Sequence, residues 1–233
     1  MKIILLPYFG GSVRSYDGVI SHLESYDCVP LSLAGIGGSP YSVRRAIGDV
    51  AEQIASVIED EFVIVGHSMG GKIALGIAGE QPVGLKGIVL IAPSPLSPEP
   101  IPDEVRQSML QNHGTREAAI ATISGATYRQ LSPEVFETAI VGNLAYSSTD
   151  WKNWLEIGSN EDESALLEGV KCPVLIMTGE FDANMNPEFL SREIGEKISG
   201  TRLEVVKGAG HLLPQEAPEE VAELIKNWLA ELN

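Results

Sequence analysis

A serine flanked by glycines carries the strongest chemical signal in the chain. Gly66-His67-Ser68-Met69-Gly70 has the spacing G-x-S-x-G, after the apolar run 62–65 and before a helix-like segment over 72–79. In a strand–turn–helix setting, small neighbours let the chain double back and leave the serine hydroxyl exposed above the sheet. A glycine-rich turn without chemistry has the same pattern, but this context favours Ser68 as a nucleophile.

A serine hydroxyl is a weak nucleophile and needs a general base. The chain has four histidines, His22, His67, His113 and His211. We expect His22 in an early helix, His113 in a helical insertion, and His67 to point away from Ser68. His211 follows the last apolar run, in a loop at the carboxyl edge of the expected sheet, where open α/β folds form their sites. His211 is therefore the candidate base.

The third group must orient the imidazole and stabilise its cation. Asp182 lies in Gly179-Glu180-Phe181-Asp182, directly after the penultimate apolar run. Glu180 is its local rival. The chain order Ser68, Asp182, His211 is the order that α/β-hydrolases use.

Six apolar runs alternate with helix-like segments along the chain. The expected strands are 2–6, 26–33, 62–65, 87–92, 173–178 and 202–206, and the expected helices include 15–24, 42–58, 72–79, 187–198 and 218–232. Strands that alternate with helices predict an α/β fold whose parallel sheet is covered by helices on both faces.

The segment from 96 to 169 breaks this alternation. It has no strong strand, and it contains twelve acidic and four basic residues. We expect a helical cap over 96–165 and a core made of 1–95 and 166–233, although ordinary core helices fit the composition equally well. Aromatic side chains in this segment are candidates for an apolar substrate pocket, and some must form the cap's own core: Tyr128, Phe136, Tyr146, Trp151 and Trp154.

Charge and cysteine content narrow the classes of partner. The net charge of −16 disfavours nucleic acid and anionic membranes as partners. Cys28 and Cys172 are expected to be free thiols, and no spacing of His and Cys suggests a metal or another cofactor. No run reaches the roughly 18 apolar residues of a membrane span, and the N-terminal run is too short for a signal peptide. We expect a cytoplasmic monomer or homodimer that acts on a small molecule.

These segments together resemble the α/β-hydrolase family with a helical cap. The resemblance rests on the serine turn 66–71, the acid loop 179–182, the loop 34–39, and Gly210-His211 followed by Pro214, Glu216 and Pro218. It covers most of the chain and implies a catalytic triad of Ser68, Asp182 and His211. Many members have two further strands before the first one here, so about six strands are expected, in the order 2-1-3-4-5-6.

The loop after the first expected strand departs from the family pattern. Pro7-Tyr8 replaces the usual His-Gly, and Pro7-Tyr8-Phe9-Gly10-Gly11-Ser12 resembles the type II thioesterases that serve peptide and polyketide synthases. By that resemblance, the backbone N–H groups of Phe9 and Met69 form the oxyanion hole.

The expected activity is hydrolysis of a carboxylic ester of a small or medium apolar substrate, through an acyl-enzyme and without a cofactor. An acyl thioesterase is the alternative among enzymes. A ligand-sensing relative with slow turnover is the alternative from another class. Lactones and carbon–carbon bonds stay open as targets because the triad is shared among these reactions.

Overall fold

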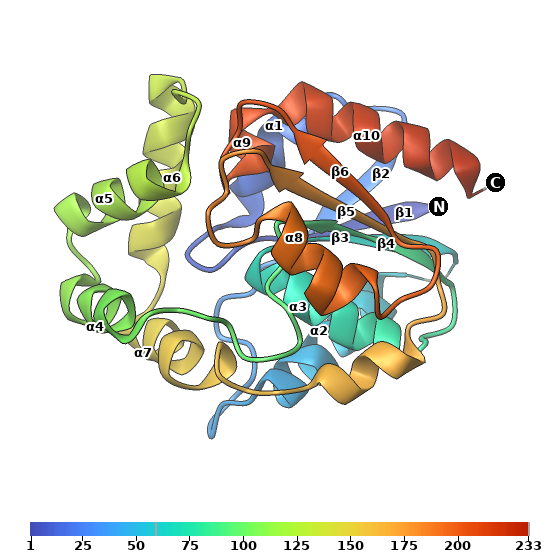
Figure 1. Cartoon of the computed structure of the whole chain (residues 1–233), viewed down its shortest axis with the longest axis horizontal. Coiled ribbons are helices and arrows are strands. Elements are labelled where there is room, and N and C mark those ends of the chain that lie inside the picture. Colours follow the sequence, from blue (N-terminus) through green and yellow to red (C-terminus); the bar gives the residue numbers. More distant parts are fainter. Residues whose placement is uncertain (59, 233) are drawn as a thin grey trace.

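A parallel sheet of six strands forms the centre of the computed structural model, which describes residues 1–58 and 60–232. The strand order is β2-β1-β3-β4-β5-β6, as predicted. The strands are β1 (Lys2–Leu6), β2 (Asp27–Pro30), β3 (Phe62–His67), β4 (Leu85–Ile91), β5 (Val174–Gly179) and β6 (Arg202–Val206) (Figure 1).

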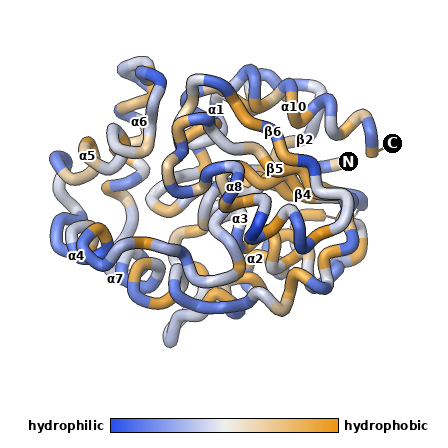
Figure 2. The backbone as a smooth tube through the Cα atoms, viewed as in Figure 1, coloured by the Kyte–Doolittle hydropathy of each residue, from blue (hydrophilic) through white to orange (hydrophobic). Residues whose placement is uncertain are grey.

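The central strands are apolar because both faces of the sheet are covered. Every residue of β3 and β5 is buried, whereas β2 and β6, at the two edges, are mostly half-buried or exposed. Figure 2 shows mostly hydrophobic colour along the strands, whereas hydrophobic and hydrophilic colours alternate along the surrounding helices. β2 is shorter than the expected 26–33, and it ends at Pro30, which has no backbone N–H to donate to a neighbouring strand.

Two layers of helices cover the sheet. The helices α1 (Asp17–Ser21), α9 (Leu213–Glu216) and α10 (Pro218–Glu231) lie on one face, and α2 (Val43–Val57), α3 (Met69–Gly79) and α8 (Pro187–Leu190) lie on the other (Figure 1). Alternation along β1 matches the two layers, since Ile3 and Leu5 pack with the first group and Ile4 and Leu6 with the second. Burial of each such side chain is worth about 1.5–3 kcal/mol.

Two expected helices are more irregular than the sequence pattern indicates. The expected 15–24 is a 3₁₀ turn, η1 (Val13–Tyr16), that leads into α1. The expected 187–198 is the single α-helical turn α8, which continues as a π-helical turn, η4 (Ser191–Gly195). Hydrophobic spacing alone does not distinguish these variants of a helical turn.

The segment between β4 and β5 is helical and contains no strand. It consists of α4 (Asp103–Asn112), α5 (Arg116–Ala126), α6 (Pro133–Ala145), α7 (Ser148–Lys152), the π-helical turn η2 (Asn153–Gly158) and the 3₁₀ helix η3 (Ser164–Gly169). Helices α4 to α7 gather beside the sheet (Figure 1). Helix α6 continues through Gly142, where a Cβ atom would lie 3.4 Å from the Ser12 hydroxyl of the neighbouring turn. The division into a cap over 96–165 and a core stays a prediction.

Among the residues that the structure describes, no helix combines the length and the apolar character that crossing a membrane requires.

Candidate active site

Ser68 occupies the sharp turn between β3 and α3. Its backbone has φ 52° and ψ −115°, a left-handed φ that non-glycine residues rarely adopt. The turn is fixed by backbone hydrogen bonds: Ser68 N–H donates to Ile91 O at 2.9 Å, and Ser68 O accepts from Gly71 N–H at 2.8 Å and Ser94 N–H at 3.0 Å. The side chain is therefore held at the carboxyl edge of the sheet in a partly exposed position.

Close backbone packing explains the glycines around Ser68. A Cβ atom on Gly66 would lie 2.4 Å from Gly70 O, and one on Gly70 would lie 2.4 Å from Leu6 O. Both distances are far inside van der Waals contact, so no side chain fits at either position. The glycines let β1, β3 and α3 meet closely enough to maintain the strained turn.

Asp182 and His211 form a hydrogen-bonded pair on neighbouring loops. The distance from His211 Nδ1 to Asp182 Oδ2 is 2.6 Å. The second oxygen, Asp182 Oδ1, accepts from Asn184 N–H at 3.0 Å and from Met185 N–H at 2.9 Å. The carboxylate is thus fixed by its own turn and directed at the imidazole.

The electrostatics of this pair favour a charged histidine stabilised by a carboxylate. Burial raises the pKa of Asp182, but the effects of His211 and the two backbone N–H donors outweigh it, and the net pKa is lowered. Burial lowers the pKa of His211, but the Asp182 charge and hydrogen bond outweigh it, and the net pKa is raised above 6.5. The Asp182 carboxylate therefore stabilises an imidazolium at position 211, as a catalytic triad would require.

Glu180, the rival carboxylate, faces away from the imidazole. It is exposed, accepts from Gly208 N–H at 3.0 Å and pairs with Lys207 at 3.2 Å. These contacts lie at the edge of the sheet next to β6, and they lower the pKa of Glu180. Because Glu180 bonds Gly208 and Lys207, Asp182 and not Glu180 is the carboxylate that contacts His211.

The ring of His67 contacts the backbone of His211. It is fully buried, and its Nε2 lies 2.9 Å from the backbone oxygen of His211. Burial lowers its pKa to about 3, so it is neutral and donates its ring N–H to that carbonyl. Of the other two histidines, His113 stacks on Trp151 at 4.3 Å, and His22 follows the last turn of α1. The structure thus brings His67 and His211 together and places the other two elsewhere.

A buried glutamate holds the loop around His211 to the segment between α5 and α6. Oε2 of Glu216, which is 8% exposed, accepts from the N–H groups of Tyr128 and Arg129, both at 2.8 Å, and of Gly210 at 3.0 Å. Its Oε1 accepts from Leu212 N–H at 3.1 Å. The residues on both sides of His211 are therefore bonded to one carboxylate. In the sequence, Glu216 is only one of the residues that follow Gly210-His211, and this role was not predicted from that pattern.

Ser68 and His211 line the same pocket, which has a volume of about 290 Å³. Its wall is mostly apolar, with a few polar side chains at fixed places, as in small-molecule sites. The lining residues are Tyr8, Phe9, Ser68, Glu99, Pro100, Ile101, Pro102, Val105, Met109, Thr122, Ile123, Ala126, Trp154, Leu155, Asn184, Met185, His211 and Leu212.

The five aromatic residues proposed for the pocket lie in different places. Trp154 lines it, and Phe9, which also does, packs against Trp151 at 4.3 Å and Tyr146 at 5.7 Å. Trp151 and Tyr146 are buried behind that contact, outside the lining. Phe136 packs in the cluster under α5 and α6, and Tyr128, 59% exposed, stacks on Phe181 at 3.8 Å. These four rings build the surrounding structure instead of the pocket wall, because hydrophobic composition does not fix which way a ring points.

The two expected oxyanion donors flank the serine turn. Met69 is the first residue of α3, and Phe9 follows β1 in the adjacent loop. Within the described part of the chain, neither backbone N–H donates a hydrogen bond. A free N–H at a helix N-terminus is suited to developing negative charge.

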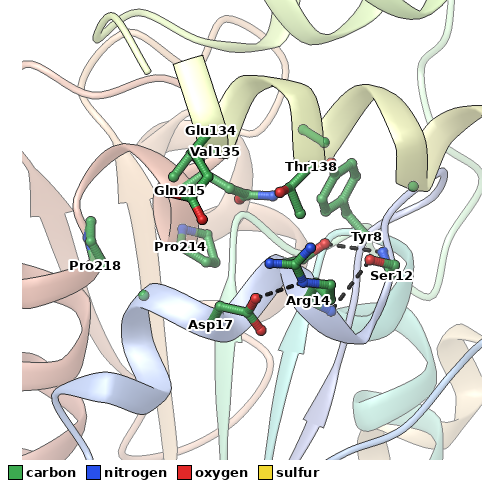
Figure 3. A pocket seen from close by; sticks show the side chains of 14 residues that line it. Tyr8, Ser12, Arg14, Asp17, Glu134, Val135, Thr138, Pro214, Gln215 and Pro218 are labelled. Atoms are coloured by element: carbon green, nitrogen blue, oxygen red, sulfur yellow. Dashed lines mark hydrogen bonds and ion pairs between the residues drawn. The ribbon is translucent and has the colours of Figure 1, made fainter. Parts of the chain in front are cut away.

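A second hollow, of about 110 Å³, lies between η1, α1, α6 and α9 (Figure 3). Arg14 and Asp17 face one another there at 2.9 Å, and Tyr8 contributes to this lining as well as to that of the larger pocket. Neither Ser68 nor His211 lines it. Over residues 1–58 and 60–232, no three His, Cys, Asp or Glu side chains form a group that could hold a metal ion.

Comparisons with known proteins agree with the fold. The family described as the alpha/beta hydrolase family matches residues 3–224. A putative 2-succinyl-6-hydroxy-2,4-cyclohexadiene-1-carboxylate synthase of Bacillus subtilis is 22% identical over 99% of this chain and 90% of its own. A pimeloyl-[acyl-carrier protein] methyl ester esterase of Yersinia pseudotuberculosis is 24% identical over 98% and 93%.

Solved structures show the same fold. A thermophilic esterase from Thermogutta terrifontis superposes with a TM-score of 0.83 at 23% identity, over 100% of this chain and 90% of that one. A putative aryl esterase from Burkholderia cenocepacia gives a TM-score of 0.84 at 21% identity, over 99% and 90%.

Proposed function

Because the chain belongs to the α/β-hydrolase family, we propose that it is a serine hydrolase that cleaves a carboxylic ester of a small or medium apolar substrate. The observation that carries the proposal is the convergence of three groups. Ser68 and His211 line one pocket, and Asp182 Oδ2 lies 2.6 Å from the Nδ1 atom of the His211 imidazole. Esterases among the relatives support ester hydrolysis as the general reaction.

The reaction proceeds as acyl transfer to water. Ser68 Oγ attacks the ester carbonyl while His211 Nε2 takes the hydroxyl proton, and Asp182 stabilises the resulting imidazolium. The oxyanion accepts hydrogen bonds from the N–H groups of Phe9 and Met69, each worth about 10²–10³ in rate. His211 then protonates the leaving alcohol. Water attacks the acyl-enzyme by the same route and releases the acid and free Ser68.

The dimensions and charge of the site favour an uncharged ester of modest size. The volume of about 290 Å³ is at the small end of ligand pockets, which span roughly 300–1,000 Å³. No lysine or arginine occurs among the residues lining the pocket. The segment 96–169 also carries twelve acidic residues against four basic ones, and that balance repels anionic carriers.

An acyl thioesterase remains the second candidate because of the loop 7–12. A ligand-sensing relative is the third, and its turnover would be slow. The Yersinia relative acts on a methyl ester, so a methyl ester is the first substrate to test here.

One substrate panel tests these three candidate functions together. Methyl butanoate, the matching butanoyl thioester and a small lactone are given to the purified protein and to Ser68→Ala. We expect ester hydrolysis by the unaltered protein with a turnover number of about 1 s⁻¹ or more, and none above background by the variant. A thioester rate well above the ester rate, or a turnover far below this range on every substrate, would contradict the proposal.

A further inference from the structure

Glu99 is an anomaly in the wall of the catalytic pocket. It lines that pocket with Ser68 and His211. Its Oε1 atom is buried and has no hydrogen-bond partner among the residues that the structure describes. A buried carboxyl oxygen without a partner costs free energy, so natural proteins seldom leave one unless a ligand or water completes it.

The position of Glu99 is fixed by its backbone. Prolines at 98, 100 and 102 restrict the chain around it. Glu99 N–H donates to Ser159 O at 2.7 Å, and the buried Lys72 holds the preceding segment through a bond of 3.3 Å to Ser97 O. The backbone of Glu99 is therefore held in place beside the pocket that its side chain lines.

Lys72 and Arg106, two of the cations whose charge acts on Glu99, donate their hydrogen bonds to other groups. The Lys72 ammonium donates to Ser97 O and to Glu161 O at 2.9 Å. Arg106 donates to Leu155 O, to Ser159 Oγ at 2.6 Å and to Asn160 Oδ1 at 3.0 Å. Burial raises the pKa of Glu99, and it outweighs the opposing effects of the Ser94 hydroxyl and of the charges on Lys72, His211 and Arg106. Within residues 1–58 and 60–232, the Glu99 carboxyl group forms no ion pair within 4.0 Å, and it faces the pocket as a hydrogen-bonding group.

The structure assigns Glu99 the recognition of a hydroxyl group on the ester substrate. This inference rests on the proposed ester hydrolysis and names its substrate class as hydroxylated esters without a carboxylate. A hydroxyl fits because it accepts from a neutral carboxyl and donates to an ionised one. A substrate carboxylate would meet Glu99 in a pocket lined by no lysine or arginine, so it is disfavoured in either state.

Pairs of esters in which a hydroxyl replaces a methyl group of similar size test this directly. One pair, methyl 3-hydroxybutanoate and methyl 3-methylbutanoate, varies the acyl side, and the other, 2-hydroxyethyl and propyl butanoate, varies the alcohol side. We expect the unaltered protein to prefer the hydroxylated member of at least one pair by about tenfold in kcat/KM. The monomethyl ester of succinic acid should be a poorer substrate than methyl butanoate.

Substitutions at position 99 then isolate the group responsible. Glu99→Met should reverse the preference in that pair, since an apolar side chain leaves the substrate hydroxyl unpaired. Glu99→Gln should retain most of it, since the amide still donates and accepts. Glu104→Gln, an exposed glutamate on α4, is the matched control and should change nothing.

The outcomes separate this inference from the proposed function. If no ester in the panel is hydrolysed, the proposed function fails. If simple esters are hydrolysed through Ser68 but neither hydroxylated ester is preferred, the Glu99 inference alone is overturned. It is also overturned if Glu99→Met and Glu99→Gln slow both members of each pair equally and shift the pH profile, because Glu99 would then act on His211 and not on the substrate.

Discussion

The serine turn and the histidine loop meet at one pocket but are held by different kinds of contact. Ser68 is positioned by backbone packing between neighbouring elements, where Gly66 and Gly70 leave no room for a side chain. His211 is positioned by hydrogen bonds. Its backbone N–H donates to Ala126 O at 2.9 Å, and Glu216 accepts from the backbone N–H groups of Gly210 and Leu212 on either side of it. The serine turn is therefore held by close packing within the core. The histidine loop is held by hydrogen bonds, several of which come from the segment between β4 and β5.

This difference predicts different sensitivities. A change at the serine turn removes the reacting atom or prevents the fold. A change in the contacts around His211 leaves the reacting atoms in place but loosens their alignment, and misplacement by about 1 Å costs roughly 10² in rate. The following predictions test that contrast, from the largest expected effect to the smallest.

Ser68→Ala should lower kcat by at least about 10³-fold, because the nucleophile is lost and the triad acts as a unit. The measurement is the initial rate on the best ester, with circular dichroism as the check on folding. Retention of more than about a tenth of the activity would mean that Ser68 is not the nucleophile.

Asp182→Asn should lower kcat by about 10²–10⁴-fold, because an amide at this position favours the wrong histidine tautomer. Glu180→Gln is the matched control, since Glu180 bonds Gly208 and Lys207 on the outer side of the same loop. Its rate should stay within about twofold of the unaltered protein, as expected for an exposed contact. Equal losses in the two variants would remove the assignment of Asp182.

Glu216→Gln should lower kcat by about ten- to a hundredfold with a smaller change in KM, because His211 loses its alignment while the pocket wall stays. It should also lower the free energy of unfolding by about 1–3 kcal/mol, since buried N–H groups lose their acceptor. Glu220→Gln is the control, because Glu220 is exposed and pairs with Arg129 at the surface. A variant destabilised at position 216 but with unchanged kcat would show that the loop does not need this support.

The pH profile sharpens the role of the Asp182–His211 pair. Only neutral imidazole accepts the serine proton, and Asp182 raises the pKa of His211 above 6.5. The value of kcat/KM should therefore fall as the pH drops through a midpoint above 6.5, and Asp182→Asn should move that midpoint down. A profile that stays flat to about pH 4 would mean that another base is used.

Salt dependence tests the acidic segment between β4 and β5. Of its four basic residues, Arg106, Arg116 and Arg129 already bond within the chain. Any activity on an acyl-coenzyme A should rise with added salt, because screening weakens repulsion of the phosphates. A larger kcat/KM for an acyl-coenzyme A than for the matching simple ester, at low salt, would instead favour the thioesterase.

The contrast between the two loops also explains what the sequence could reveal. Six apolar runs that alternate with helices predicted the parallel sheet, because burial on both faces leaves a pattern in each strand, and the resemblance to the α/β-hydrolase family predicted the strand order. The glycines around Ser68 marked the serine turn because a steric requirement is local in sequence. Helix type over 187–198 and the end of β2 were missed because they depend on single hydrogen bonds.

Long-range polar contacts left no such pattern. The bonds that Glu216 accepts from Tyr128 and Arg129 join residues that are 88 and 87 positions apart in the sequence. The unpartnered oxygen of Glu99 becomes visible only once the pocket is assembled. Which aromatic rings line the pocket was likewise decided by side-chain direction, which composition does not encode.

Mass spectrometry of the acyl-enzyme tests the central claim most directly. The protein is mixed with an activated butanoyl ester, quenched in acid within one turnover and digested. The account predicts a butanoyl group on the peptide that contains Ser68, at the Ser68 hydroxyl, and no adduct in Ser68→Ala. An adduct on any other side chain of the unaltered protein, or turnover by Ser68→Ala at the normal rate, would contradict it.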